Sequence, residues 1–278
     1  MKLFDLSGQV AIVTGGTKGI GRGIVERLAE HGARVVVSAR DQAGCEAAAA
    51  EINQRYGQGA VVAAGIAANL DKVDTLQALV DKASATFGRI DILVCNAAIL
   101  PFIGPSADTP RELFSRIMEG NIHNTFRLCH MVLPQMRARK SGNIVIIGSV
   151  SGLRPSTTEM AYGLSKAAQA HLARSLAAEV VGDRVRVNCI APGLVRSFSS
   201  RPVWENDAVL GGFTRNIPLG RIGEPDDIAG GVVFLCSQAG SYITGQVIPM
   251  EGGVSTVPVA GEGIGDLEAL YPTEHRFN

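Results

Sequence analysis

Short runs of apolar and β-branched residues alternate along this chain with segments whose apolar residues recur at helical spacing. Such buried strands are typical of a parallel sheet covered on both faces by helices, because a crossover between parallel strands needs a helix. The 278 residues contain no repeat or linker that would divide them, so we expect one α/β domain over 1–278. The expected strands are 9–13, 33–39, 60–64, 90–94, 143–147, 184–190 and 246–249.

Helical periodicity places the intervening helices. One helix is expected to follow the glycine-rich residues 14–21, and Asp41 is expected to cap the next. Apolar spacing predicts a helix over 71–87, a long helix over about 111–139, and another that ends near Glu179. A further helix is expected to begin at Pro225.

Composition excludes several classes of protein. Lys plus Arg and Asp plus Glu both number 26, so no basic face for nucleic acid is predicted. The N-terminus has no signal-peptide pattern and no apolar run approaches membrane-spanning length. The five cysteines are odd in number and lack a C-x-x-C spacing, which indicates reduced thiols in a cytoplasmic protein. The histidines lack metal-ligand spacing, and no metal site is predicted.

The segment TGGTKGIG follows the first predicted strand directly and opens a helix. Glycines at this position let the backbone turn tightly and approach a pyrophosphate, whose charge is favourable at a helix N-terminus. The spacing is G-x-x-x-G-x-G and differs from the G-x-G-x-x-G dinucleotide fingerprint. Alone, such a loop is also compatible with an ordinary tight turn.

A second chemical pattern begins at the end of the fifth predicted strand. Ser149 lies where that strand ends, which is where open α/β sheets bind ligands. Tyr162 and Lys166 are four residues apart on the following helix and therefore share one face. A phenol has an ordinary pKa of about 10; a nearby ammonium would lower that pKa and suit the tyrosine to proton transfer at neutral pH. The spacing by itself is weak, and its place after a strand-end serine strengthens it.

Taken together, these motifs resemble those of the short-chain dehydrogenase/reductase family, over nearly the whole of residues 5–254. The matching segments, in the family's order, are TGGTKGIG at 14–21, CNAA at 95–98, Asn121, Ser149, YGLSK at 162–166 and VNCIAPGLVRS at 187–197.

The resemblance implies a seven-stranded Rossmann sheet, a nicotinamide cofactor and hydride transfer between a carbonyl and an alcohol carbon. It implies that Tyr162 is the general acid/base, that Ser149 orients and polarises the carbonyl, and that Lys166 lowers the tyrosine pKa and holds the nicotinamide ribose. Asn121 would fix a water that links the lysine to solvent. The implied cofactor contacts are Gly15, Thr17, Lys18, Gly19, Ile20, Gly21, Arg40, Asn69, Leu70, Asn96, Ala97, Ala98, Tyr162, Lys166, Pro192, Gly193, Val195 and Ser197.

Several of these residues have a plainer interpretation or depart from the family pattern. Asn96 could serve mainly to tie strands together. Ala98 replaces the glycine usual in the family, Asn69 the acidic residue that commonly faces adenine, and Ser197 the usual threonine. None of these changes removes a catalytic group.

Charge at the end of the second strand predicts the choice of cofactor. An NAD site carries an acidic side chain there, which binds the ribose 2′-hydroxyl and repels a 2′-phosphate. This chain has Ala39, followed by Arg40, with Lys18 in the glycine loop. Two cations suit a phosphate, so NADP(H) is predicted and NAD(H) is the less favoured alternative.

The substrate is left more open. Apolar residues in the loops after three strands favour an aliphatic, cyclic or aromatic ketone or the matching alcohol, whereas Arg154, Arg196 and Arg201 could hold an anionic group. The alternatives are a 3-oxoacyl-thioester reductase, a sugar or polyol dehydrogenase and, in another class, a non-catalytic NADP-binding sensor or scaffold. The apolar loop residues are Ile99, Leu100, Phe102, Val150, Leu153, Phe198, Trp204 and Phe213.

Residues 255–278 extend beyond the usual end of the family. Leu267, Leu270, Tyr271 and Phe277 make this extension unusually apolar for a solvated tail. We expect it to pack over a substrate pocket or a subunit interface, and the resemblance implies a homotetramer or a homodimer.

Overall fold

The computed structural model describes residues 2–99 and 103–255. Seven strands form one sheet in the order β3-β2-β1-β4-β5-β6-β7, and every neighbouring pair is parallel. This arrangement confirms the predicted α/β class and its parallel sheet. The strands are β1 (Val10–Thr14), β2 (Arg34–Ser38), β3 (Ala63–Gly65), β4 (Ile92–Cys95), β5 (Gly142–Ile147), β6 (Val185–Pro192) and β7 (Val247–Met250).

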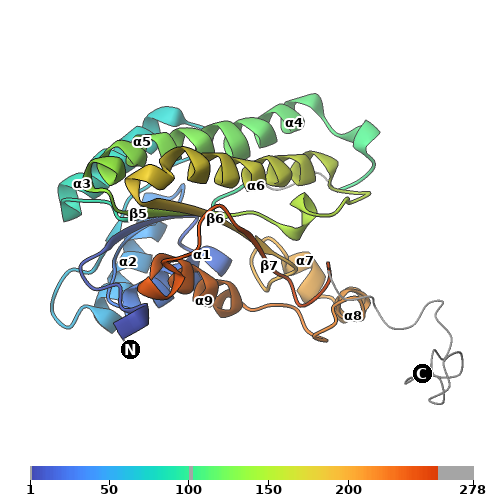
Figure 1. Ribbon diagram of the computed structural model, residues 1–278. Coiled ribbons are helices and arrows are strands. Elements are labelled where there is room, and N and C mark those ends of the chain that lie inside the picture. Colours follow the sequence, from blue (N-terminus) through green and yellow to red (C-terminus); the bar gives the residue numbers. More distant parts are fainter. Residues whose placement is uncertain (1, 100–102, 256–278) are drawn as a thin grey trace, which may run out of the picture.

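Helices cover both faces of the sheet (Figure 1). Helices α3, α4, α5 and α6 lie on one side, whereas α1, α2 and α9 lie on the other, and the short α7 and α8 lie near β7. The helices are α1 (Gly19–Glu30), α2 (Gln42–Tyr56), α3 (Val73–Phe87), α4 (Arg111–Met118), α5 (Asn124–Arg139), α6 (Met160–Val180), α7 (Arg201–Trp204), α8 (Asp207–Thr214) and α9 (Pro225–Cys236).

Alternate residues of the central strands enter two separate cores. In β1, Val10 and Ile12 pack with α3, α5 and α6, whereas Ala11 and Val13 pack with α1, α2 and α9. Both faces of the sheet are therefore buried, which explains why the strand sequences are continuously apolar. All five cysteines are buried and free.

Two predicted elements were wrong in their extent. The third strand begins at Ala63, not at residue 60. The backbone N–H groups of Val62 and Ala63 donate to the side-chain oxygen of Asn53 rather than to a neighbouring strand. The helix expected over 111–139 is divided by η3 (Glu119–His123), a π-helical turn. The short helices α7 and α8 were not predicted from the sequence.

The connections after β1 and β4 run to opposite sides of the sheet, since β1 lies between β2 and β4 in the strand order. A crevice outside the carboxyl ends of the strands is expected at such a switch point. Across the described part of the chain, no helix is both long and apolar enough to cross a membrane. The sequence predictions for Leu100, Phe102 and the C-terminal extension from residue 256 fall outside the described residues.

Candidate active site

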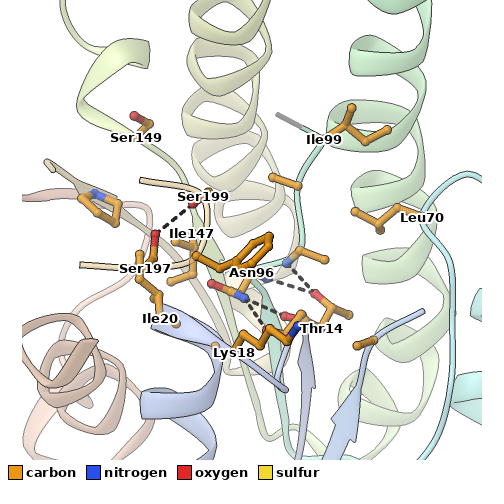
Figure 2. Close-up of a pocket in the computed structure, with 18 of the residues that line it drawn as sticks. Thr14, Lys18, Ile20, Leu70, Asn96, Ile99, Ile147, Ser149, Ser197 and Ser199 are labelled. Carbon is orange, nitrogen blue, oxygen red and sulfur yellow. Dashed lines mark hydrogen bonds between the residues drawn. The ribbon is translucent and has the colours of Figure 1, made fainter. Parts of the chain in front are cut away.

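A cavity of about 670 Å³ lies at the carboxyl ends of the strands. It is bordered by every residue proposed from the sequence for cofactor binding, and by Ser149, Tyr162 and Lys166. Figure 2 shows Lys18, Thr14 and Asn96 at one end of this cavity and Ser149 at the other. The structure thus brings the two sequence motifs, which lie more than a hundred residues apart, to one site.

The glycine loop between β1 and α1 forms a cradle that side chains would fill. Gly15 and Gly19 have φ values of +66° and +54°, in the left-handed region that favours glycine. A Cβ on Gly21 would lie 2.1 Å from the backbone oxygen of Gly15. The backbone can therefore approach a bound group closely at the N-terminus of α1, and this geometry fits a dinucleotide pyrophosphate.

Hydrogen bonds between β1 and β4 hold this loop in place. The Thr14 hydroxyl accepts from the backbone N–H groups of Asn96 and Ala97 at 3.0 and 3.1 Å. In return, the Asn96 amide donates to the backbone oxygens of Thr14 and Gly15 at 2.9 and 3.3 Å. Asn96 therefore ties the two strand ends together, which is the plainer of its two interpretations, while it also borders the cavity.

Ser149 is half-buried where β5 ends, just before the 3₁₀ turn η4 (Val150–Gly152). Its side-chain oxygen accepts from the backbone N–H of Ser151 at 3.1 Å. The hydroxyl keeps its own proton for donation, because this bond uses only a lone pair. It is suited to donate to an oxygen in the cavity.

Tyr162 lies in the first turn of α6 and borders the same cavity. Burial raises the pKa of its phenol, and the carboxylate of Glu159 raises it further, while the Ser149 hydroxyl acts in the opposite direction. The sequence had predicted a lowered pKa, and this expectation is wrong for the protein without ligand. The physical reason is that desolvation disfavours the phenolate, while the Lys166 ammonium donates its hydrogen bonds to Ile147 and Gln169.

Lys166 is buried one turn further along α6, with 2% of its surface exposed. Its Nζ donates to the backbone oxygen of Ile147 and to Oε1 of Gln169, both at 2.9 Å, and lies 5.3 Å from the ring centroid of Tyr162. Burial lowers the pKa of Lys166 from 10.5 to about 8, because a charged amine is costly in an apolar interior.

Asn121 lies in the π-helical turn η3 and is fully buried. Its side chain accepts from the backbone N–H of Ile99 at 2.7 Å and donates to the Ile99 oxygen and to the Ser165 hydroxyl, both at 3.1 Å. Asn121 does not border the cavity. It connects the segment after β4 with α6, and the wider π turn is what places it there, as such turns often do at functional sites.

The three arginines that could hold an anionic substrate are occupied by other groups. Arg196 forms an ion pair with Glu224, and Arg201 forms one with Glu205. Arg154 donates to the backbone oxygen of Val254 at 3.1 Å. None of the three borders the cavity, whereas Ile99 and Phe198 do.

Comparison with known proteins agrees with this geometry. A family model described as Enoyl-(Acyl carrier protein) reductase matches residues 15–255. The chain is 40% identical over 248 residues to a Bos taurus protein named Dehydrogenase/reductase SDR family member 4, covering 89% of this chain and 88% of the relative. The chain belongs to the short-chain dehydrogenase/reductase family. It is accordingly an oxidoreductase.

Solved structures of the family superpose closely on the chain. A Pseudomonas aeruginosa structure described as an RhlG/NADP active-site complex is 35% identical, with a TM-score of 0.85, over 91% of this chain and 99% of the other. A gluconate 5-dehydrogenase from Burkholderia cenocepacia J2315, in complex with NADP and tartrate, is 27% identical, with a TM-score of 0.87, over 92% and 99% of the two chains.

Three features of this short-chain dehydrogenase/reductase site were missed by sequence reasoning. The first is Thr14, whose hydroxyl holds the backbone of Asn96 and Ala97 in place. Its position at the start of the glycine motif could have drawn attention to it. The ion pair between Asp71 and Arg116, 2.7 Å apart at the cavity wall, joins residues distant in sequence. Gln169 is the third, and only its position one turn after Lys166 could have drawn attention to it.

Proposed function

We propose that the chain is an NADP(H)-dependent oxidoreductase that interconverts a ketone and a secondary alcohol. The observation that carries this proposal is that Ser149, Tyr162 and Lys166 border the same cavity as the glycine cradle. A redox cofactor and a proton donor can then act on one substrate carbon and its oxygen.

A bound nicotinamide dinucleotide would supply the hydride for reduction of the carbonyl carbon. Ser149 donates a hydrogen bond to the carbonyl oxygen and orients it. The Tyr162 hydroxyl gives its proton to that oxygen as the negative charge develops there. In the direction of oxidation, the phenolate of Tyr162 takes the proton from the alcohol.

Lys166 supports the tyrosine electrostatically. Its ammonium lies 5.3 Å from the Tyr162 ring centroid in an interior of low dielectric, where charges interact strongly. The same amine would hold the ribose of the dinucleotide. Bound cofactor and charged Lys166 together would offset the burial that raises the tyrosine pKa in the protein alone.

The choice of NADP(H) over NAD(H) is supported by the end of β2. Ala39 offers no carboxylate to a ribose 2′-hydroxyl, and exposed Arg40 borders the cavity beside it. The carboxylate of the neighbouring Asp41 caps α2 by accepting from the Gly44 N–H at 2.9 Å. Lys18 also borders the cavity, with its Nζ 5.0 Å from the Phe198 ring centroid, and provides a second cation for a 2′-phosphate. The relatives described with NADP support the same choice.

The apolar walls formed by Ile99 and Phe198 favour an aliphatic, cyclic or aromatic ketone. A sugar or polyol dehydrogenase is the second candidate, and a solved relative described as a gluconate 5-dehydrogenase supports it. A 3-oxoacyl-thioester reductase is the third. A non-catalytic sensor is disfavoured because serine, tyrosine and lysine are all present at one cavity.

A substrate panel tests this function. Purified protein is mixed with NADPH and ketones, β-keto thioesters or keto sugars, and in the reverse direction with NADP⁺ and alcohols or polyols, while the absorbance of the reduced nicotinamide is followed. We expect turnover with apolar ketones and their alcohols, and none with the Tyr162→Phe variant beyond about a hundredth of wild type. Cofactor binding without turnover of any member of a broad panel would instead favour the sensor.

We further propose that the chain forms a homodimer or a homotetramer. Phe114 on α4, Phe126 on α5 and Leu164 on α6 are exposed apolar side chains of the kind that oligomer interfaces cover. Light scattering after gel filtration should give a particle mass that is a multiple of the 29.1 kDa chain mass. The Phe126→Asp variant should have a lower particle mass. A monomeric wild type would contradict the proposal.

A further inference from the structure

Gln169 is a buried polar side chain that the proposed chemistry does not use. It lies on α6 one helical turn after Lys166, with 1% of its surface exposed. Its Oε1 accepts from Lys166 Nζ at 2.9 Å, and its Nε2 donates to the backbone oxygen of Asn121 at 2.7 Å and to the Thr125 hydroxyl at 3.3 Å. The amide therefore bridges α6 and the π-helical turn η3.

The orientation of this amide follows from its partners. An ammonium can only donate hydrogen bonds and a backbone carbonyl can only accept them. The oxygen of Gln169 must therefore face Lys166 and its nitrogen must face Asn121. A reversed amide would leave a buried ammonium against N–H groups and a carbonyl against a carbonyl, which is unfavourable on both sides.

The surroundings of Lys166 make this contact important for its charge. The titratable groups that face the ammonium are Tyr162 on its own helix, Cys95 on β4 and Cys189 on β6. A hydrogen bond with Cys129, together with burial, raises the pKa of the Cys95 thiol, and burial raises the pKa of the Cys189 thiol. Both thiols therefore stay protonated and without charge at neutral pH. The charged form of the lysine thus depends on two neutral acceptors, the Ile147 carbonyl and the Gln169 amide.

We propose that Gln169 is a positioning residue, which keeps Lys166 in its charged form and fixes the direction of its ammonium beneath Tyr162. The amide can do so because its nitrogen is anchored on the backbone oxygen of Asn121 at 2.7 Å. This inference rests on the role proposed above for Lys166.

The same amide also connects Lys166 with Asn121. The family resemblance implies a water that links the lysine to solvent; the Gln169 amide adds a direct side-chain bridge between Lys166 and the backbone of Asn121. A water can accept one proton while it releases another; a neutral amide does not readily do so. The bridge therefore holds Lys166 in place without carrying protons between the two residues.

The test uses two substitutions with opposite expected effects on the pH profile. Gln169→Met keeps an unbranched side chain of similar size but removes the acceptor, which disfavours the ammonium. Gln169→Glu places a carboxylate against it, which favours the ammonium. We expect the alkaline limb of kcat/KM to move down by about one pH unit in the first variant and up by about one unit in the second.

Cofactor affinity gives a readout that does not depend on turnover. NADPH fluorescence titrations across pH 6.5–9.5 should show the same two opposite shifts, because the charged lysine is the form that holds the ribose. Thr125→Val is the matched control, since it removes only the weaker 3.3 Å contact to the same amide; its profiles should match those of wild type. Circular dichroism establishes that each variant is folded.

The Lys166→Met background separates this inference from the function on which it rests. In that background Gln169→Met should have no further effect on the pH dependence of NADPH binding. The positioning role would be overturned if the pH profiles of the two Gln169 variants moved in the same direction, or if neither profile moved, while Lys166→Met still abolished turnover. Normal turnover by Lys166→Met would instead overturn the proposed role of the lysine, and this inference with it.

Discussion

The two ends of the candidate active-site cavity differ in how the protein holds their charged groups. At the catalytic end, Lys166 is 2% exposed and donates to two defined acceptors within 2.9 Å. At the opposite end, Arg40 is exposed on the loop after β2. The buried cation has its geometry set by the protein before any ligand binds, whereas the exposed one can take its geometry from the ligand.

This difference separates chemistry from specificity. Electrostatic catalysis requires preorganised charges in a dry environment, and a buried hydrogen-bond network supplies that at the cost of stability. Recognition of a 2′-phosphate needs only charge-assisted hydrogen bonds at a surface. Substitutions at the end near Lys166 should therefore have large effects on turnover and on the pH dependence of stability. Substitutions at the end near Arg40 should have smaller effects, which change the kinetics with NADPH more than those with NADH.

The largest expected effect is the loss of the tyrosine hydroxyl. Tyr162→Phe removes the proton-transferring oxygen and leaves the ring, so turnover should fall by about 10²-fold or more while NADPH still binds. Steady-state kinetics and fluorescence titration measure the two quantities separately. A variant with near-normal turnover would show that the tyrosine does not transfer the proton.

The second prediction concerns stability and pH. Folded Lys166 releases its proton near pH 8, whereas the unfolded chain retains it up to about 10.5. The unfolded state therefore binds more protons in this interval, and the penalty for the buried charge decreases as pH rises. The free energy of unfolding of wild type, relative to Lys166→Met, should increase by at most about 1.4 kcal/mol per pH unit between pH 8 and 9.5.

Urea denaturation of both proteins at several pH values measures this difference. Other titrating groups are the same in the two chains and largely cancel. A difference that stayed constant with pH would mean that the buried lysine has an ordinary pKa.

The third prediction tests the exposed end of the cavity. Arg40→Ala should raise the Michaelis constant for NADPH about tenfold, which corresponds to about 1.4 kcal/mol, with little change for NADH. Arg215→Ala, at a residue that does not border the cavity, is a suitable control. If wild type uses NADH as efficiently as NADPH, the assigned cofactor preference is incorrect.

The smallest effect is expected one residue further along. Asp41→Ala removes the side-chain cap of α2, at a cost of about 1 kcal/mol in the free energy of unfolding. The ratio of NADPH to NADH efficiency should hardly change, because the carboxylate serves the helix. A marked gain in NADPH preference would show that Asp41 instead opposes the phosphate.

Sequence reasoning worked best where a local rule applies. The buried strands, the glycine loop and the Asp41 cap depend on neighbouring residues, and the structure confirms all three. The four-residue spacing of Tyr162 and Lys166 likewise placed both on one side of α6. Sequence reasoning failed where contacts between residues distant in sequence decide the outcome. Examples are the π turn at Asn121 and the raised pKa of Tyr162.

The sequence by itself determined the succession of the seven strands along the chain, the position of the glycine loop and the candidate reactive side chains, because hydrophobic periodicity and glycine placement act over a few residues. Only the tertiary structure decided which way the Lys166 ammonium points, that Gln169 meets it, and that Arg196 and Arg201 are taken by other partners. These properties depend on burial and on contacts between separate segments. They arise only when the sheet brings those segments together.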